Sequence, residues 1–147
     1  MSHEHEKRYS ESVEMYVKEI YLLARDGDPA TTGDIADALG VSPPSVTDRL
    51  SHLEDRGLVD HRKRRGTTLT ERGEREGRRI LRKHCRIERF LVERLDMTEG
   101  FHDEACRLEH AMSDDIADRL DKYVDLPPEC PECYDRDAQH CSRLFEA

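Results

Sequence analysis

The stretch "TTGDIADALGVSPPSVTDRLSHLEDRGLVDHRKRRGTTLT", residues 31–70, decides the fold of the first half of the chain. A short helix is expected over 31–39, because a threonine can cap its start and Gly40 can end it. A second helix is expected after Ser42, an N-cap candidate that prolines follow in the first turn, where a missing N–H does no harm. Its apolar residues share one face: Val46, Leu50 and Leu53. Two short helices joined by a tight turn form a helix-turn-helix.

The segment that follows, "GLVDHRKRRGTTLTERG" (57–73), predicts the wing of a winged helix. Leu58 and Val59 can begin one strand, "TTLT" suits a second, and "RKRRG" is a basic connection between them. With the helix-turn-helix directly upstream, DNA contact is favoured over a merely solvated charge run. The candidate DNA-binding residues are Ser42, Pro44, Ser45, Thr47, Asp48 and Arg49 in the helix and Arg62, Lys63, Arg64 and Arg65 in the wing.

The charge distribution supports this interpretation, although the formal net charge of −9 at first argues against nucleic acid as a partner. Residues 42–83 carry 12 basic and 7 acidic side chains, so the acidic excess lies mostly elsewhere. The basic residues are 19 Arg and 5 Lys, set against 33 acidic residues. That balance leads to the hypothesis of a protein whose acidic surface keeps it soluble in a salt-rich cytoplasm.

The 147 residues suffice for one ordinary domain, or for a small module with a second helical piece. The longest purely apolar run, 20–24, is far shorter than the ~20 residues that span a bilayer, and the start "MSHEHEKRYS" has no signal-peptide hydrophobic region. We therefore expect a cytoplasmic protein with no membrane partner. Five cysteines in that compartment are expected to be thiols or metal ligands, not a disulfide framework.

Helical periodicity extends over most of the remaining chain. It predicts helices over about 10–24, over 71–95, and from 101 or 102 past Met112 through "DDIADRLDKYV". The expected fold is mainly α, with an N-terminal winged helix-turn-helix, a helical dimerisation domain and a Cys-rich tail. The expected boundaries are 1–74, 75–126 and 127–147.

Metal-ligating side chains gather in "HDEACRLEHAMSDD" (102–115). His102, Cys106, Glu109 and His110 advance by 4, 3 and 1, which places them on one face of a helix. A thiol, a carboxylate and two imidazoles suit a divalent transition metal better than Ca²⁺ or Mg²⁺. One helix earlier, His84 and Glu88 at i and i+4 form a second cluster, although such a pair is often only a surface pair.

The combination resembles the diphtheria toxin repressor family of metal-dependent transcription repressors. The resemblance covers about 10–125 and rests on "EMYVKEIYLL", the winged helix, "LRKHCRIERFL" and above all "HDEACRLEHAMSD". It implies a homodimer that binds a palindromic operator in double-stranded DNA and represses metal-homeostasis genes when its metal is bound. It also implies two metal sites, a primary one of Met15, Cys106, Glu109 and His110 and an ancillary one of His84, Glu88 and His102.

Two positions make the chain look like the iron-responsive branch. The manganese-selective branch has Asp and Glu where this chain has Met15 and Cys106, so Fe²⁺ is the expected effector and Mn²⁺ the alternative. Two departures limit the likeness. The SH3-like domain of many iron-branch members is expected to be missing, and Asp48 stands where that branch has Gln, so the operator is expected to differ.

The tail holds "CPEC" followed by "HC". Cys130, Cys133, His140 and Cys141 form a possible tetrahedral Zn²⁺ site, with a redox-active pair or spare thiols as alternatives. An enzyme is not expected, since no nucleophile motif or HExxH pair is present, and no small-molecule substrate is expected. A metal-trafficking protein is the remaining alternative, because it would use the same ligands without a basic wing.

Overall fold

The computed structural model describes residues 9–62 and 64–145. The chain divides into an N-terminal unit, Tyr9–Arg79, and a C-terminal unit that begins at Ile80. The division falls inside helix α4 (Glu71–Glu93), and the boundary predicted after residue 74 lies in the same helix. Among the described residues, no helix is both long and apolar enough to cross a membrane.

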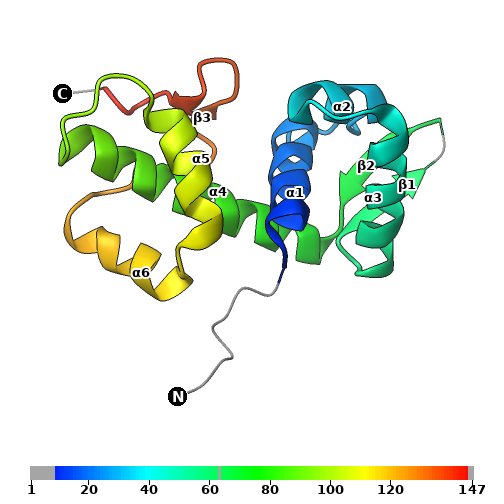
Figure 1. Ribbon diagram of the computed structural model, residues 1–147, viewed down its shortest axis with the longest axis horizontal. Coiled ribbons are helices and arrows are strands. Elements are labelled where there is room, and N and C mark those ends of the chain that lie inside the picture. The colour runs from blue at the N-terminus through cyan, green and yellow to red at the C-terminus, as the bar shows by residue number, and fades with distance from the viewer. Residues whose placement is uncertain (1–8, 63, 146–147) are drawn as a thin grey trace. The chain divides into compact units, whose positions relative to one another are not determined.

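The N-terminal unit contains the expected helix-turn-helix (Figure 1). Helix α1 (Glu11–Ala24) is followed by α2 (Thr32–Leu39) and α3 (Pro43–Asp55). Thr31 Oγ1 accepts the Asp34 N–H at the start of α2, and Gly40 ends that helix in the left-handed conformation. Ser42 Oγ accepts the Ser45 N–H at the start of α3. The core is apolar and fully buried, and its largest members are Ile20, Ile35, Leu50, Leu53 and Leu58.

The wing is a two-stranded antiparallel sheet. Strand β1 (Val59–Arg62) pairs with β2 (Gly66–Leu69), with Val59 opposite Leu69 and Arg62 opposite Gly66. Backbone hydrogen bonds of 2.8 Å join Ala30 and Thr67 in both directions and attach the sheet to the segment before α2. The predicted winged helix-turn-helix is thus confirmed. Of the predicted wing residues, Lys63 lies outside the residues that the structure describes.

The C-terminal unit is helical over most of its length. After α4 come α5 (Phe101–Ala111), α6 (Asp114–Arg119) and the 3-10 turn η2 (Leu120–Lys122). The sequence predicted one helix running past Met112, but Met112 is extended, with φ −82° and ψ 131°. The break has a local cause, because Ser113 Oγ accepts the Ile116 N–H and so starts a new helix.

The last segment, predicted to be a tail, is folded into the same unit. It carries a short hairpin in which β3 (Tyr134–Asp135) pairs with β4 (His140–Cys141). Cys141 and Leu144 are buried in one cluster with side chains of α4 and α5: Ile87, Leu91, Phe101 and Ala105. Burial of these apolar groups attaches the hairpin to the two helices that hold the predicted metal ligands.

Candidate metal centre

Helices α4 and α5 supply six of the predicted metal ligands. His84 and Glu88 lie one helical turn apart on α4, and the other four lie on α5: His102, Cys106, Glu109 and His110. Most are almost completely inaccessible, with His84 at 0%, Glu88 and Glu109 at 1% and His110 at 6% exposed. Polar side chains buried to this degree need partners, since burial without a hydrogen bond is costly.

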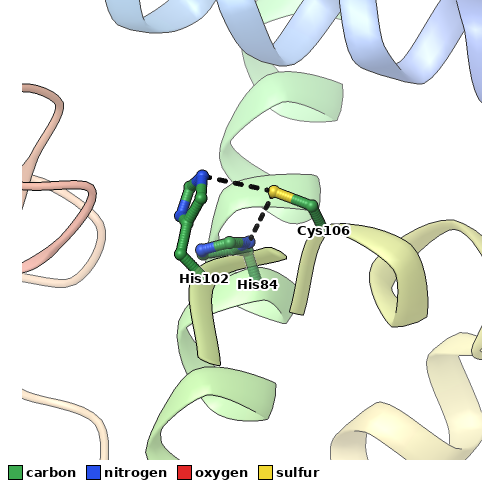
Figure 2. Close-up of side chains that lie close together, drawn as sticks. All are labelled: His84, His102 and Cys106. Carbon is green, nitrogen blue, oxygen red and sulfur yellow. Dashed lines mark hydrogen bonds between the residues drawn. The ribbon is translucent and has the colours of Figure 1, made fainter. Parts of the chain in front are cut away.

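The centre of the group is formed by two imidazoles and a thiol (Figure 2). The Sγ atom of Cys106 lies 3.5 Å from Nε2 of His102 and 4.0 Å from Nδ1 of His84. One ligand atom from each of these residues lies within 4.8 Å of the other two. The separation is small enough for one ion to be shared by all three.

Carboxylates hold the His84 ring from both sides. Glu109 Oε1 lies 2.6 Å from His84 Nδ1, and Glu88 Oε2 lies 2.8 Å from His84 Nε2. Glu88 Oε2 also lies 3.8 Å from His102 Nδ1, and Glu109 Oε2 lies 3.3 Å from His110 Nε2. Six of the seven residues that the resemblance assigns to two sites, all but Met15, are therefore connected in one network, with His84 at its centre.

The contacts change the acidity of these groups. The pKa of His102 rises to about 9, because Cys106 and then Glu88 hydrogen-bond to its ring, against the effect of burial. Burial alone would raise the pKa of Glu88, but hydrogen bonds from His102 and His84 outweigh it and lower that pKa. The carboxylate of Glu88 is thus held in the ionised form that a metal requires.

The donor set fits a divalent transition metal. The second oxygen of Glu88, Oε1, is buried and has no hydrogen-bond partner, which is unusual for an ionised group in a protein interior. A cation would satisfy that oxygen. Imidazole, thiolate and carboxylate ligands together are typical of borderline metals such as Fe²⁺, Co²⁺ and Zn²⁺.

Tyr134 is a member of the centre that the sequence analysis missed. Its hydroxyl lies 3.3 Å from Nδ1 of His102, and its ring packs edge-on against His84 with centroids 5.5 Å apart. It is buried and belongs to strand β3. No periodicity or motif relates a tyrosine of the C-terminal segment to two histidines on helices, so only the fold reveals this contact.

Two family models together match nearly the whole chain. Residues 8–67 match the N-terminal DNA-binding domain of the iron dependent repressor, and residues 70–136 match its metal-binding and dimerisation domain. The chain belongs to the iron-dependent repressor family. The diphtheria toxin repressor of Corynebacterium diphtheriae is 37% identical over 115 residues, 78% of this chain and 51% of that protein. The resemblance inferred from sequence is therefore confirmed.

Other members of the iron-dependent repressor family match over similar lengths. An HTH-type transcriptional regulator of Methanocaldococcus jannaschii is 40% identical over 118 residues, 79% of this chain and 94% of that protein. The solved structure of the manganese regulator SloR is similar with a TM-score of 0.69 and 37% identity, covering 81% of this chain and 56% of that one. This family member thus spans about half the length of several relatives. The names of two of them state different metals: the iron-dependent repressor IdeR of Mycobacterium tuberculosis and the manganese regulator SloR.

The remaining predicted residues lie as follows. Met15 is on α1 and is 39% exposed, off the core face, as its helical position predicted. Most candidate DNA-binding residues are exposed: Ser42, Pro44, Ser45, Thr47, Asp48, Arg62, Arg64 and Arg65, with Arg49 half-buried. In the C-terminal segment Cys130 and Cys141 are buried, and Cys133 and His140 are half-buried.

Proposed function

We propose that this member of the family is a metal-dependent repressor that binds DNA as a homodimer, with Fe²⁺ as its effector. One observation carries the proposal above all others. Six candidate metal ligands, His84 among them, form one connected network within the unit that matches the family's metal-binding domain, and a winged helix precedes that unit in the same chain. A metal-trafficking protein would have no use for the winged helix.

The N-terminal unit has the features of a DNA reader. Helix α3 exposes Ser45, Thr47 and Asp48 at its start, where recognition helices contact base edges in the major groove. The wing exposes Arg62, Arg64 and Arg65, whose guanidinium groups suit phosphate contacts. We propose that a palindromic operator is bound, because two copies of one reader related by a two-fold axis recognise repeated half-sites.

Exposed apolar side chains of the C-terminal unit support a homodimer. Leu95, Leu108, Ile116 and Tyr123 are between 37% and 56% exposed. The match of residues 70–136 to the family's metal-binding and dimerisation domain favours a second copy of this chain as the surface that covers them. A self-complementary interface between two copies is the commonest arrangement of soluble oligomers.

The ligand chemistry supports Fe²⁺ over Mn²⁺. Cys106 supplies a soft thiolate beside His84 and His102, whereas Mn²⁺ prefers carboxylate, carbonyl and water ligands. The similarity to SloR keeps Mn²⁺ as the alternative. Met15 is retained as a further proposed ligand on the family resemblance alone. A bound divalent cation would supply the positive charge that balances the buried thiolate and carboxylates.

The test is an anaerobic DNA-binding measurement at high KCl. Fragments of the gene's own promoter and of iron-uptake or iron-storage promoters are titrated with protein at increasing Fe²⁺ and, separately, Mn²⁺. Variants Cys106→Ser and Met15→Leu test the ligands, and Glu104→Gln, an exposed substitution on the same helix, is the control. Sedimentation of the protein alone measures its oligomeric state.

We expect Fe²⁺-dependent binding that chelation reverses, with both ligand variants weakened and the control unchanged. Response to Mn²⁺ alone would assign the chain to the manganese regulators. Equal binding without metal would refute metal dependence, and metal uptake without any DNA binding would favour a trafficking role.

A further inference from the structure

Four of the five cysteines gather away from Cys106, in the C-terminal unit. Cys85 lies on α4, and the other three come from the C-terminal segment: Cys130, Cys133 and Cys141. None of the five cysteines, all of which the structure describes, is in a disulfide. The cluster thus consists of free thiols.

The four thiols form two neighbouring pairs. Sγ of Cys141 lies 3.0 Å from Sγ of Cys133, and the Cys85 thiol is hydrogen-bonded to Cys130. Cys141 is also a neighbour of Cys85, and Cys130 of Cys133. Cys85, Cys130 and Cys141 are 0–2% exposed. Among the described residues, only His84, His102 and Cys106 have three ligand atoms all within 4.8 Å of one another, so the two thiol pairs would draw together to share one ion. Four cysteines, two of them from a CxxC, are a ligand set of structural zinc sites.

We propose that Cys85, Cys130, Cys133 and Cys141 bind a structural Zn²⁺ ion that joins helix α4 to the C-terminal hairpin. Four thiolates at about 2.3 Å from the ion satisfy tetrahedral zinc completely, so no position is left open for water or substrate. This site shares no ligand with the centre around His84. The inference therefore goes beyond the proposed function. It assigns a role to cysteines that the proposed repressor activity does not use.

The surroundings stabilise negative charge on sulfur. The guanidinium of Arg89, itself 8% exposed, lies 3.9 Å from Sγ of Cys141, and the Arg143 backbone N–H donates to the same sulfur at 3.4 Å. Arg82 donates to the carbonyl oxygen of Cys130 at 2.7 Å. Four thiolates around Zn²⁺ carry a net charge of −2, and N–H donors and cations of this kind are the usual second layer around such sites.

The fourth ligand differs from the one that the sequence suggested. His140 is half-buried, and its Nδ1 atom donates to the Cys141 carbonyl oxygen at 2.8 Å. Its ring lies edge-on to Phe145, with centroids 5.3 Å apart. Cys85 was not a candidate ligand, because it lies 45 residues before Cys130 in the chain. Packing of the hairpin on α4 makes it a better fourth ligand than the adjacent histidine.

A zinc ion here would also support the regulatory centre. Cys133 directly precedes Tyr134, whose hydroxyl contacts His102, and Cys85 directly follows His84. Because Cys133 and Cys85 are adjacent to Tyr134 and His84 in the chain, zinc bound by the two cysteines would fix the backbone of those two residues of the regulatory centre. The expected consequence is that loss of this zinc loosens the hairpin and weakens metal binding around His84.

The experiment measures zinc in protein purified from zinc-containing medium under reducing conditions. The full chain is treated with a chelator strong enough to empty the His84 centre, and retained zinc is quantified by mass spectrometry. Cobalt substitution then reports the ligands, because tetrahedral thiolate sites give intense sulfur-to-cobalt charge-transfer bands. Variants are Cys85→Ser, Cys133→Ser and His140→Ala, with Cys106→Ser as the matched control in the other centre.

We expect about one retained zinc per chain in the wild type, His140→Ala and Cys106→Ser. Cys85→Ser and Cys133→Ser should retain less than about a tenth of it, and circular dichroism reports whether their helices persist. Loss of zinc in His140→Ala with retention in Cys85→Ser would assign the fourth ligand to histidine and overturn the proposal. Absence of zinc from the folded wild type, or a Cys133–Cys141 disulfide detected by mass under reducing purification, would overturn it as well.

Discussion

The Nδ1 atom of His84 on α4 lies 2.6 Å from the Oε1 atom of Glu109 on α5. The family resemblance assigns these residues to different metal sites, but in the structure they share a hydrogen bond in the interior, and both are 0–1% exposed. A change in the protonation or ligation of one therefore changes the environment of the other. Binding at the two assigned sites is expected to be energetically coupled.

Glu109→Gln tests this central contact. The amide keeps the size of the side chain but removes the charge that holds the His84 ring and that a metal requires. We expect metal affinity to fall about 10- to 100-fold. Anaerobic Co²⁺ or Fe²⁺ titration measures it, with the exposed Glu104→Gln on the same helix as control. Equal affinities of the two variants would contradict the role of Glu109.

Tyr134→Phe tests the contact that sequence reasoning missed. Loss of the hydroxyl frees Nδ1 of His102 from its 3.3 Å partner but preserves ring packing on His84. A neutral hydrogen bond contributes about 0.5–1.5 kcal/mol, so metal affinity should weaken by roughly 2- to 13-fold while the melting temperature changes little. Tyr123→Phe, at an exposed tyrosine of the same unit, should leave the titration curve unchanged.

The raised pKa of His102 makes the metal-free protein sensitive to pH. Because Cys106 and Glu88 favour the protonated ring, His102 contributes stability that is fully present below its ordinary pKa of 6.5 and is lost as the pH rises through about 9. Urea unfolding with chelator present, at pH values on either side of this window, measures the free energy of unfolding of wild type and of His102→Gln. The difference between the two free energies should shrink with rising pH, and a constant difference would refute the raised pKa of His102.

Arg65→Ala tests the wing. Arg65 is exposed beside the β1–β2 turn, and we propose that it contacts phosphate. Its removal should weaken operator and unrelated DNA alike and lower the slope of log affinity against log salt by about 0.9. Arg107→Ala, at an exposed arginine of α5, is the charge-matched control. A loss of specificity without a change of slope would mean that Arg65 reads bases.

Gly66→Ala tests how the wing is attached. Gly66 has φ +100°, and a Cβ there would lie 2.8 Å from the carbonyl oxygen of Ala30. Strain in the left-handed region costs about 1–3 kcal/mol, so the melting temperature of the metal-free protein should fall. Gly33→Ala is the control, since a Cβ there would lie 3.9 Å from Oγ1 of Thr31, an ordinary contact distance. Equal melting temperatures of the wild type and Gly66→Ala would argue against strain at this position of the wing.

Local sequence was sufficient for most of the secondary structure. The apolar spacing and the caps at Thr31, Gly40 and Ser42 predicted α2 and α3 within a residue, because helices depend on contacts between residues three or four apart. The same periodicity placed Cys106, Glu109 and His110 on one face of α5. It did not predict the break at Met112. There the side chain of Ser113 caps a new helix, α6, so that α5 does not continue.

The sequence by itself thus determined the winged helix, the identity of the family and the kinds of metal ligand that α4 and α5 carry. The tertiary structure decided which of those ligands meet. His84 meets Glu109 from 25 residues away, Tyr134 reaches His102 from 32 residues away, and Cys85 neighbours Cys130. Such contacts join residues far apart in the chain, and no local period encodes them. They form only when burial of apolar side chains packs the hairpin against α4 and α5.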